Sequence, residues 1–218
     1  TSPESASPPS PAAGPELPET AGDADYAAVA NPITLTPETP DRPLELVYMF
    51  WYGCGTCQAV DGEVADFIAS LPPDVRTVRV PGMFEDDELW MNHARLYFAL
   101  ETLGRETALP AGMFAAVWGG AGAGHGEARL ADFGQAAEWA VRNGMSREEF
   151  AGAWNSPEAE EGLRRALAYE NNLKMESVPA LGINGRYAVY MTGTPDRFLG
   201  AARKLLSGER ARLGGPAG

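Results

Sequence analysis

The chain has 218 residues, of which 44 % are hydrophobic, so it can form one domain with an insertion or two small domains. Its formal net charge of −13 argues against nucleic acid or an anionic membrane as a partner. No apolar stretch approaches the roughly 18 residues that a membrane-spanning helix needs.

The first 25 residues are dominated by Pro, Ser, Ala, Gly and Glu. This composition cannot bury enough apolar surface to fold, so residues 1–25 are predicted to be a disordered arm. The arm could tether the protein to a membrane or a second domain, or have no role. The sequence starts at Thr1 rather than Met, and we expect that a signal or anchor segment has been removed.

The first folded unit is predicted to be a β-α-β motif, with order beginning near Tyr26. The apolar run 44–52 predicts a buried central strand, and 58–71 predicts the helix that follows it. Residues 74–80, rich in Val and Thr, predict a second strand parallel to the first.

The next segment, residues 85–175, has a helical pattern throughout. Pro110 suits the first turn of one helix, and Ser146 with Glu149 forms a capping box at the start of another. Five helices are predicted, at 89–103, 109–118, 130–141, from 146, and from 156 to about 175.

The chain then returns to strand. Residues 180–183 and 186–190 flank Asn184-Gly185, a strong β-hairpin signal. Thr194 is predicted to cap a last helix that ends at Leu206.

The order of elements predicts an α/β protein: a thioredoxin-like fold with an inserted all-helical domain. The thioredoxin-like part is expected to comprise residues 26–84 and 176–208, and the helical domain residues 85–175. Residues 209–218, which include several glycines, are expected to form a flexible tail.

The only two cysteines, Cys54 and Cys57, lie where the first strand turns into its helix. Unpaired N–H groups and the positive end of the helix dipole favour a thiolate at Cys54. Cys57 lies one turn further and should be more buried. We therefore expect Cys54 to exchange with substrate and Cys57 to resolve the mixed disulfide. The absence of other cysteines suits an oxidising compartment.

Two other roles for the cysteine pair are weaker. A zinc site would need two more ligands, and His93 and His125 are isolated in the sequence. A purely structural disulfide across two residues would remove little entropy from the unfolded chain. No metal and no cofactor are therefore expected.

A second candidate element is Val178-Pro179, just before the hairpin. Its position predicts a cis peptide bond in a loop that faces the cysteines. The backbone of Val178 could then bind an extended segment of substrate. Trp51 and Tyr52, next to the cysteines, are expected to shape an apolar peptide groove, while the other tryptophans are expected in the core.

From about Pro43 to Leu206, the chain resembles the DsbA family of bacterial thiol–disulfide oxidoreductases. The resemblance rests on Phe50-Trp-Tyr-Gly-Cys-Gly-Thr-Cys57, Arg79-Val-Pro81, residues 94–104, residues 150–156, and Ser177-Val-Pro-Ala-Leu-Gly-Ile-Asn-Gly-Arg-Tyr187. It implies a periplasmic protein that oxidises unfolded or partly folded exported proteins with free cysteines. It also implies reoxidation by a DsbB-like, quinone-linked membrane oxidase. A monomer is expected, because no second dimerisation domain is visible.

The resemblance also implies roles for individual residues. Cys54 would be the exposed nucleophile, and Cys57 its buried partner. Gly55 and Thr56 would be the dipeptide that tunes the couple, and Pro179 the cis-proline. Asp61 stands where relatives often carry a buried acid that relays protons to the inner sulfur; the alternative is a solvated helix position.

The chain departs from the family at the tuning dipeptide. Many strongly oxidising members have Pro-His there, and a histidinium stabilises the thiolate in a way that Thr56 cannot. The couple is therefore expected to lie between about −120 mV, the DsbA value, and about −230 mV, at the glutaredoxin limit. Tyr48 stands where thioredoxins keep a buried Asp, which weakens the case for a thioredoxin-like reductant.

Two alternatives to a dithiol oxidase remain open. One is a periplasmic reductase or isomerase for a specific client, such as a cytochrome maturation protein. The other is a non-catalytic peptide-binding module that carries a disulfide.

Overall fold

The computed structural model describes residues 26–30, 32, 43–84, 87–105, 110–118 and 130–214. The predicted disordered arm, residues 1–25, lies outside the described residues, as do the last four residues of the predicted tail. Within the described part of the chain, none of the helices combines the length and the apolar character that crossing a bilayer requires.

Five strands and seven helices make up the described structure. In chain order they are β1 Tyr26–Ala28, β2 Leu44–Phe50, α1 Gly55–Ala69, β3 Val75–Pro81, α2 Glu88–Thr102, α3 Pro110–Trp118, α4 Phe133–Arg142, α5 Arg147–Trp154, α6 Pro157–Leu173, β4 Ala180–Ile183, β5 Tyr187–Tyr190 and α7 Pro195–Arg212.

The strands form one mixed sheet in the order β1-β5-β4-β2-β3. β2 pairs in parallel with β3 through α1, and antiparallel with β4. β4 and β5 form the predicted hairpin, and β1 adds to its outer edge. The predicted fold class is confirmed: this is a thioredoxin-like sheet in which a run of helices, α2 to α6, lies between β3 and β4.

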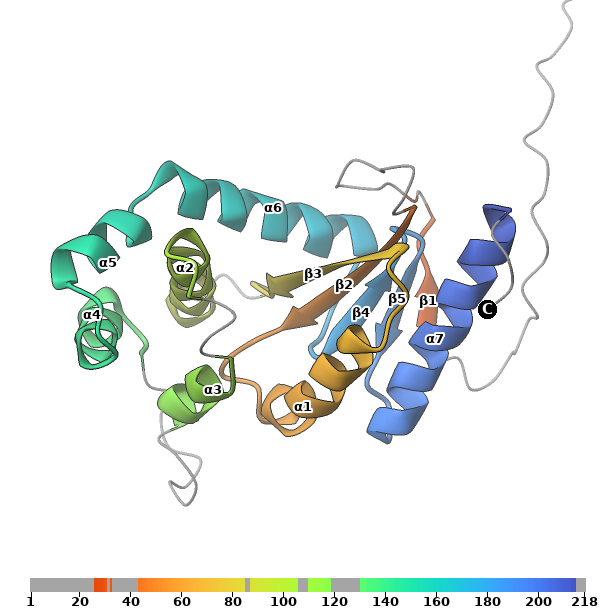
Figure 1. The fold of residues 1–218 in the computed structure, drawn as a ribbon, viewed down its shortest axis with the longest axis horizontal. Coiled ribbons are helices and arrows are strands. Elements are labelled where there is room, and N and C mark those ends of the chain that lie inside the picture. Colours follow the sequence, from red (N-terminus) through yellow and green to blue (C-terminus); the bar gives the residue numbers. More distant parts are fainter. Residues whose placement is uncertain are drawn as a thin grey trace, which may run out of the picture.

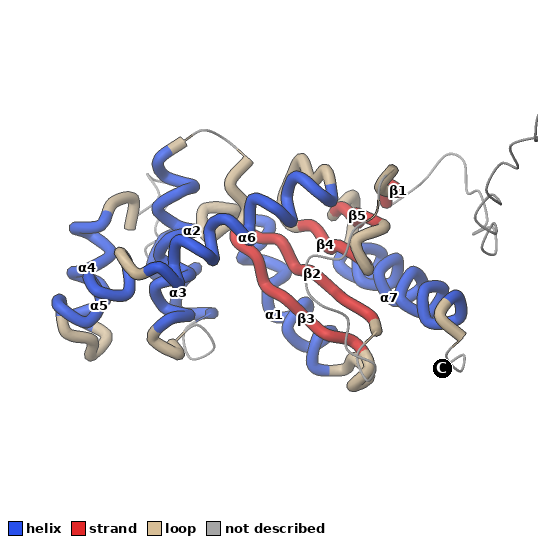
Figure 2. Tube along the Cα trace, turned by 90° about the horizontal axis from the view of Figure 1, so that it is seen from above, coloured by secondary structure: helices blue, strands red, loops and turns tan. Residues whose placement is uncertain are grey.

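Helices cover both faces of the sheet (Figure 1). α6 lies along one face, and α1 and α7 lie side by side on the other. Figure 2, turned by 90°, shows α2 to α5 gathered beyond one end of the sheet, with α6 leading back from them over the strands. All seven residues of β2 are buried, which explains why this segment is a continuous apolar run rather than an alternating one.

Local capping signals define several helix starts. Ser146 and Glu149 form the predicted capping box, and α3 begins at Pro110 as expected. Asp87, Asp132, Ser156 and Thr194 are the N-caps of α2, α4, α6 and α7.

The Asn184-Gly185 turn does more than reverse the chain. Both residues have positive φ, 50° and 65°, as a tight hairpin requires. The Asn184 side chain accepts a hydrogen bond from the Glu45 N–H at 3.3 Å and donates to Glu209 at 3.1 Å. The turn therefore ties β2 to α7.

The C-terminal helix corrects one expectation. The predicted end at Leu206 is wrong, because α7 continues to Arg212, so residues 209–212 are helical rather than part of a tail. Buried charge explains the extension: Glu209 is 2 % exposed and pairs with Arg212 at 2.8 Å. Arg210 binds both oxygens of Asp74, at 2.7 and 2.9 Å. The short strand β1 was not predicted.

Candidate active site

Cys54 is the N-cap of α1, the position from which a side chain can bind the free N–H groups of the first turn. Its sulfur accepts a hydrogen bond from the Cys57 N–H at 3.0 Å. The helix thus begins at Gly55, three residues before the predicted start, and the Cys54 sulfur lies at the positive end of its dipole.

The environment of Cys54 favours its thiolate. A hydrogen bond from the Cys57 thiol is the main cause that lowers the pKa of Cys54 to about 7, against the opposing effect of partial burial. The backbone N–H groups of Cys57 and Thr56 stabilise the same negative charge. Both cysteines are free thiols in this structure.

Cys57 has the opposite character. Its side chain is fully buried, and burial raises its pKa far above the ordinary value, with the hydrogen bond to Cys54 as a second cause. Cys57 therefore stays protonated and acts as the donor while Cys54 is ionised. Gly55 and Thr56, between them, are exposed.

The Val178-Pro179 loop lies against the cysteines. The Val178–Pro179 peptide bond is cis, and the Cys54 thiol contacts the Val178 carbonyl oxygen at 3.7 Å. Gly82 approaches the same loop closely, since a Cβ there would lie 3.3 Å from the Val178 side chain and 3.0 Å from Phe84.

Asp61 is buried beneath the pair, 9 % exposed, so the alternative of a solvated helix position is wrong. Its carboxylate accepts a hydrogen bond from Arg79 of β3 at 2.6 Å. The guanidinium also lies 5.0 Å from the ring centres of Tyr48 and Phe50. Burial works against the charge of Arg79, but the Asp61 carboxylate outweighs it and the pKa of Arg79 is raised.

The Asp61 carboxylate also affects Cys57, the inner of the two cysteines. The Asp61 carboxylate is a smaller cause of the raised pKa of Cys57. Tyr48 lies beside Arg79, and its buried hydroxyl has no hydrogen-bond partner among the described residues. Burial is the main cause that raises the pKa of Tyr48 well above its ordinary value, and the Asp61 carboxylate adds to it.

The two aromatic residues beside the cysteines differ in exposure. Trp51 is half-buried and stacks on Trp90 of α2, with ring centres 3.9 Å apart. Tyr52 is only 4 % exposed and packs on Phe50 and Phe114 in the core. Of the two, Trp51 is therefore the one whose side chain remains partly accessible.

Two links between the helices and the active-site turn were missed in the sequence. The Trp118 indole of α3 donates a hydrogen bond to the Tyr52 carbonyl at 3.1 Å, and Trp90 supplies the stack on Trp51. No sequence pattern predicts these contacts. For Arg79 there was a signal, because a cation in a strand next to the buried β2 requires a partner.

The described residues hold no group of three or more His, Cys, Asp or Glu side chains that could bind a metal ion. His93 is fully buried beside Trp51 and Tyr52. His125 lies outside the described residues.

No protein-family model matches the chain. Curated proteins do: the thiol:disulfide interchange protein DsbA of Pseudomonas aeruginosa is 29 % identical over 194 residues, covering 86 % of this chain and 84 % of that protein. DsbA of Pseudomonas syringae pv. tomato is 28 % identical over 170 residues, covering 77 % of this chain and 76 % of that protein.

Solved structures of DsbA proteins are also similar to this chain. The crystal structure of Pseudomonas aeruginosa DsbA matches with a TM-score of 0.76 and 26 % identity, covering 87 % of this chain and 94 % of that one. DsbA from Xylella fastidiosa matches with a TM-score of 0.75 and 27 % identity, covering 86 % and 96 %. The fold, the paired cysteines and the similarity to these relatives over most of the chain together support a DsbA-like thiol–disulfide oxidoreductase.

Proposed function

We propose that this protein introduces disulfide bonds into exported proteins through the Cys54–Cys57 couple. The observation that carries the proposal is the asymmetry of the two thiols. Cys54 is partly exposed with a pKa lowered to about 7, whereas Cys57 is fully buried with a strongly raised pKa. One sulfur is therefore a good leaving group that substrate can reach, and the other is protected from substrate.

The reaction starts from the Cys54–Cys57 disulfide. A substrate thiolate attacks the Cys54 sulfur, a bond forms between them, and Cys57 leaves with the electron pair and takes up a proton. A second substrate thiolate then attacks the substrate sulfur of the mixed disulfide, and Cys54 leaves as a thiolate. The substrate has lost two electrons and gained one disulfide, and the enzyme holds the dithiol of this structure.

The surroundings of the cysteines fit these steps. The N–H groups at the start of α1 stabilise the departing Cys54 thiolate in the second step. The high pKa of Cys57 drives its protonation in the first step. We assign Asp61, paired with Arg79, as the group that relays this proton, since it is the buried carboxylate closest in sequence to Cys57.

Substrate binding is assigned to the backbone of Val178, ahead of Pro179, with Trp51 alongside. The Val178 carbonyl lies 3.7 Å from the Cys54 sulfur, so a chain paired with this residue would bring its own cysteine to the reactive atom. Recognition through backbone groups suits unfolded or partly folded clients, because it requires no particular side-chain sequence. Gly55 and Thr56 tune the couple from the exposed start of α1.

Repeated turnover requires that two electrons leave the reduced enzyme each time. We assign this step to a DsbB-like, quinone-linked membrane oxidase, and the site of action to the periplasm, from the DsbA relatives. The enzyme is proposed to act as a monomer.

The decisive experiment is the reduction potential of the couple, measured by equilibration in glutathione buffers with Trp fluorescence as the readout. A value between about −120 and −230 mV is expected. A value near the thioredoxin level of about −270 mV would show a reductant and overturn the proposal. Replacement of Cys54 with Ser should abolish oxidation of a reduced client, and unchanged function in the cell would instead favour a binding module.

A further inference from the structure

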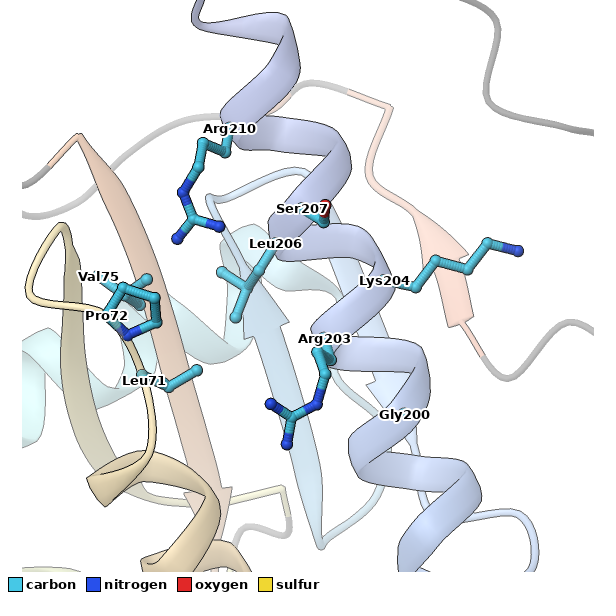
Figure 3. Close-up of a pocket in the computed structure, with 9 residues that line it drawn as sticks. All are labelled: Leu71, Pro72, Val75, Gly200, Arg203, Lys204, Leu206, Ser207 and Arg210. Carbon is cyan, nitrogen blue, oxygen red and sulfur yellow. The ribbon is translucent and has the colours of Figure 1, made fainter. Parts of the chain in front are cut away.

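A groove of about 560 Å³ lies between α7 and the loop that joins α1 to β3 (Figure 3). It is lined by Leu71, Pro72, Val75, Gly200, Arg203, Lys204, Leu206, Ser207 and Arg210. Cys54 lies at the opposite end of α1, whose 15 residues span roughly 22 Å. The groove is therefore separate from the thiol-exchange site.

The lining combines an apolar floor with cations. Leu71, Val75 and Leu206 supply aliphatic surface, and the three charged residues of the lining are all Arg or Lys. Among the residues that the structure describes, no carboxylate lines the groove, although the whole chain carries a net charge of −13. Because Asp74 neutralises Arg210, the positive charge available inside the groove is that of Arg203, which favours an anionic ligand.

Arg203 is the cation best placed to bind that ligand. Its guanidinium lies over the Phe67 ring, 5.0 Å from the ring centre, and forms no ion pair with any described residue. Figure 3 shows it directed into the groove beside Leu71, whereas Lys204 is directed away. Contact with the ring occupies one face of the guanidinium and leaves its N–H edges available for a carboxylate. Arg210, by contrast, is held by Asp74.

We propose that this groove binds a small amphipathic monocarboxylate, with the carboxylate on Arg203 and the hydrocarbon body over Leu71, Val75 and Leu206. The volume falls within the range of small-molecule sites, about 300–1,000 Å³. The ligand is a soluble molecule rather than an anionic membrane, because the net charge of −13 repels such a surface.

The test uses the full chain and sodium decanoate below its micelle concentration, with binding followed by calorimetry and by amide chemical shifts. Saturable binding with shifts at the residues of the groove is expected, and 1-decanol should bind at least fivefold more weakly. Arg203→Gln should weaken decanoate binding at least fivefold. Lys204→Gln is the matched control and should leave it within twofold of the parent protein.

A steric variant gives a second, independent test. A Cβ at Gly200 would meet no atom within 4 Å, so Gly200→Leu should be accommodated and should fill the groove. It is expected to abolish decanoate binding while the circular dichroism spectrum and thiol-exchange activity stay unchanged.

Three results would overturn the proposal: no saturable binding of decanoate, equal losses in Arg203→Gln and Lys204→Gln, or full binding by a folded Gly200→Leu protein. Binding to anionic vesicles in the absence of decanoate binding would also overturn it in favour of a membrane. None of these experiments changes Cys54, so their results are independent of whether the proposed thiol–disulfide activity is correct.

Discussion

The Cys57 N–H donates a hydrogen bond to the Cys54 sulfur at 3.0 Å, and the Cys57 thiol is the main group that stabilises the Cys54 thiolate. The two cysteines therefore act as a unit in the reduced protein. Cys57 lowers the pKa of Cys54 because it stays protonated, and it stays protonated chiefly because it is buried.

Replacing Cys57 should raise the pKa of Cys54 from about 7 towards that of a free thiol. Cys57→Ala removes the side-chain donor, whereas Cys57→Ser keeps a hydroxyl donor, so the alanine variant should show the larger increase. The pKa of Cys54 is measured from the pH dependence of thiolate absorbance at 240 nm. The pH dependence of the rate at which iodoacetamide alkylates Cys54 gives a second measurement. Equal pKa values in both variants and the parent would contradict this role of Cys57.

The reduced protein should be most stable near the ordinary thiol pKa of about 8.5. Between about pH 7 and 8.5, native Cys54 binds fewer protons than it does in the unfolded chain, so the free energy of unfolding rises with pH. Above that, native Cys57 keeps a proton that the unfolded chain releases, so stability falls. Urea unfolding at a series of pH values tests this. The rise should be absent from Cys54→Ser and from the oxidised protein.

Placing a cation beside the Cys54 thiolate should make the couple more oxidising. Thr56→His puts an imidazolium at an exposed position in the first turn of α1 and is expected to lower the pKa of Cys54 by about 1. That change corresponds to an increase of about 30 mV in the reduction potential. Thr56→Gln, which is polar but neutral, is the control and should change the potential little. A potential in Thr56→His equal to that of the control would contradict the prediction.

Removing the charge of Asp61 should destabilise the protein and favour ionisation of Cys57. Asp61→Asn leaves the Arg79 guanidinium buried without its carboxylate, at a cost of about 2 kcal/mol, because both side chains retain some contact with solvent. The pKa of Cys57 should fall, since the Asp61 charge opposes its ionisation. Denaturant unfolding and thiolate titration in a Cys54→Ser background measure the two effects.

The control for that experiment is Asp66→Asn, an exposed carboxylate on the same helix. It should change stability by less than about 0.5 kcal/mol. If Asp66→Asn and Asp61→Asn have equal effects, the buried ion pair with Arg79 is not the cause.

Two helical glycines should respond oppositely to substitution by Ala. A Cβ at Gly162 of α6 would lie 2.3 Å from the buried Phe98 ring, so Gly162→Ala should cost about 1–3 kcal/mol by forcing α2 and α6 apart. Gly152 of α5 has no atom within 4 Å of such a Cβ, so Gly152→Ala should stabilise by up to about 1 kcal/mol. Denaturant unfolding of both proteins tests the pair, and the same sign for both would refute the packing argument.

Much of the fold followed from short segments. The continuous apolar run of β2, the Asn184-Gly185 turn and the Ser146 capping box lie where the sequence predicts them. Element ends were less predictable. The last helix continues beyond Leu206 because Glu209 binds Asn184 and Arg210 binds Asp74, and no local pattern predicts these long-range contacts.

The active site also combines features that short segments predict with features that depend on long-range contacts. That Cys54 and Cys57 share the first turn of a helix could be predicted from the sequence, because a two-residue spacing at a strand-to-helix junction is a local property. Their surroundings depend on the way distant segments pack together: Val178 lies 124 residues from Cys54 along the chain, and Arg79 lies 18 residues from Asp61. Burial and pairing of charge depend on every segment that packs around a group, and these two quantities set the unequal pKa values of the cysteines.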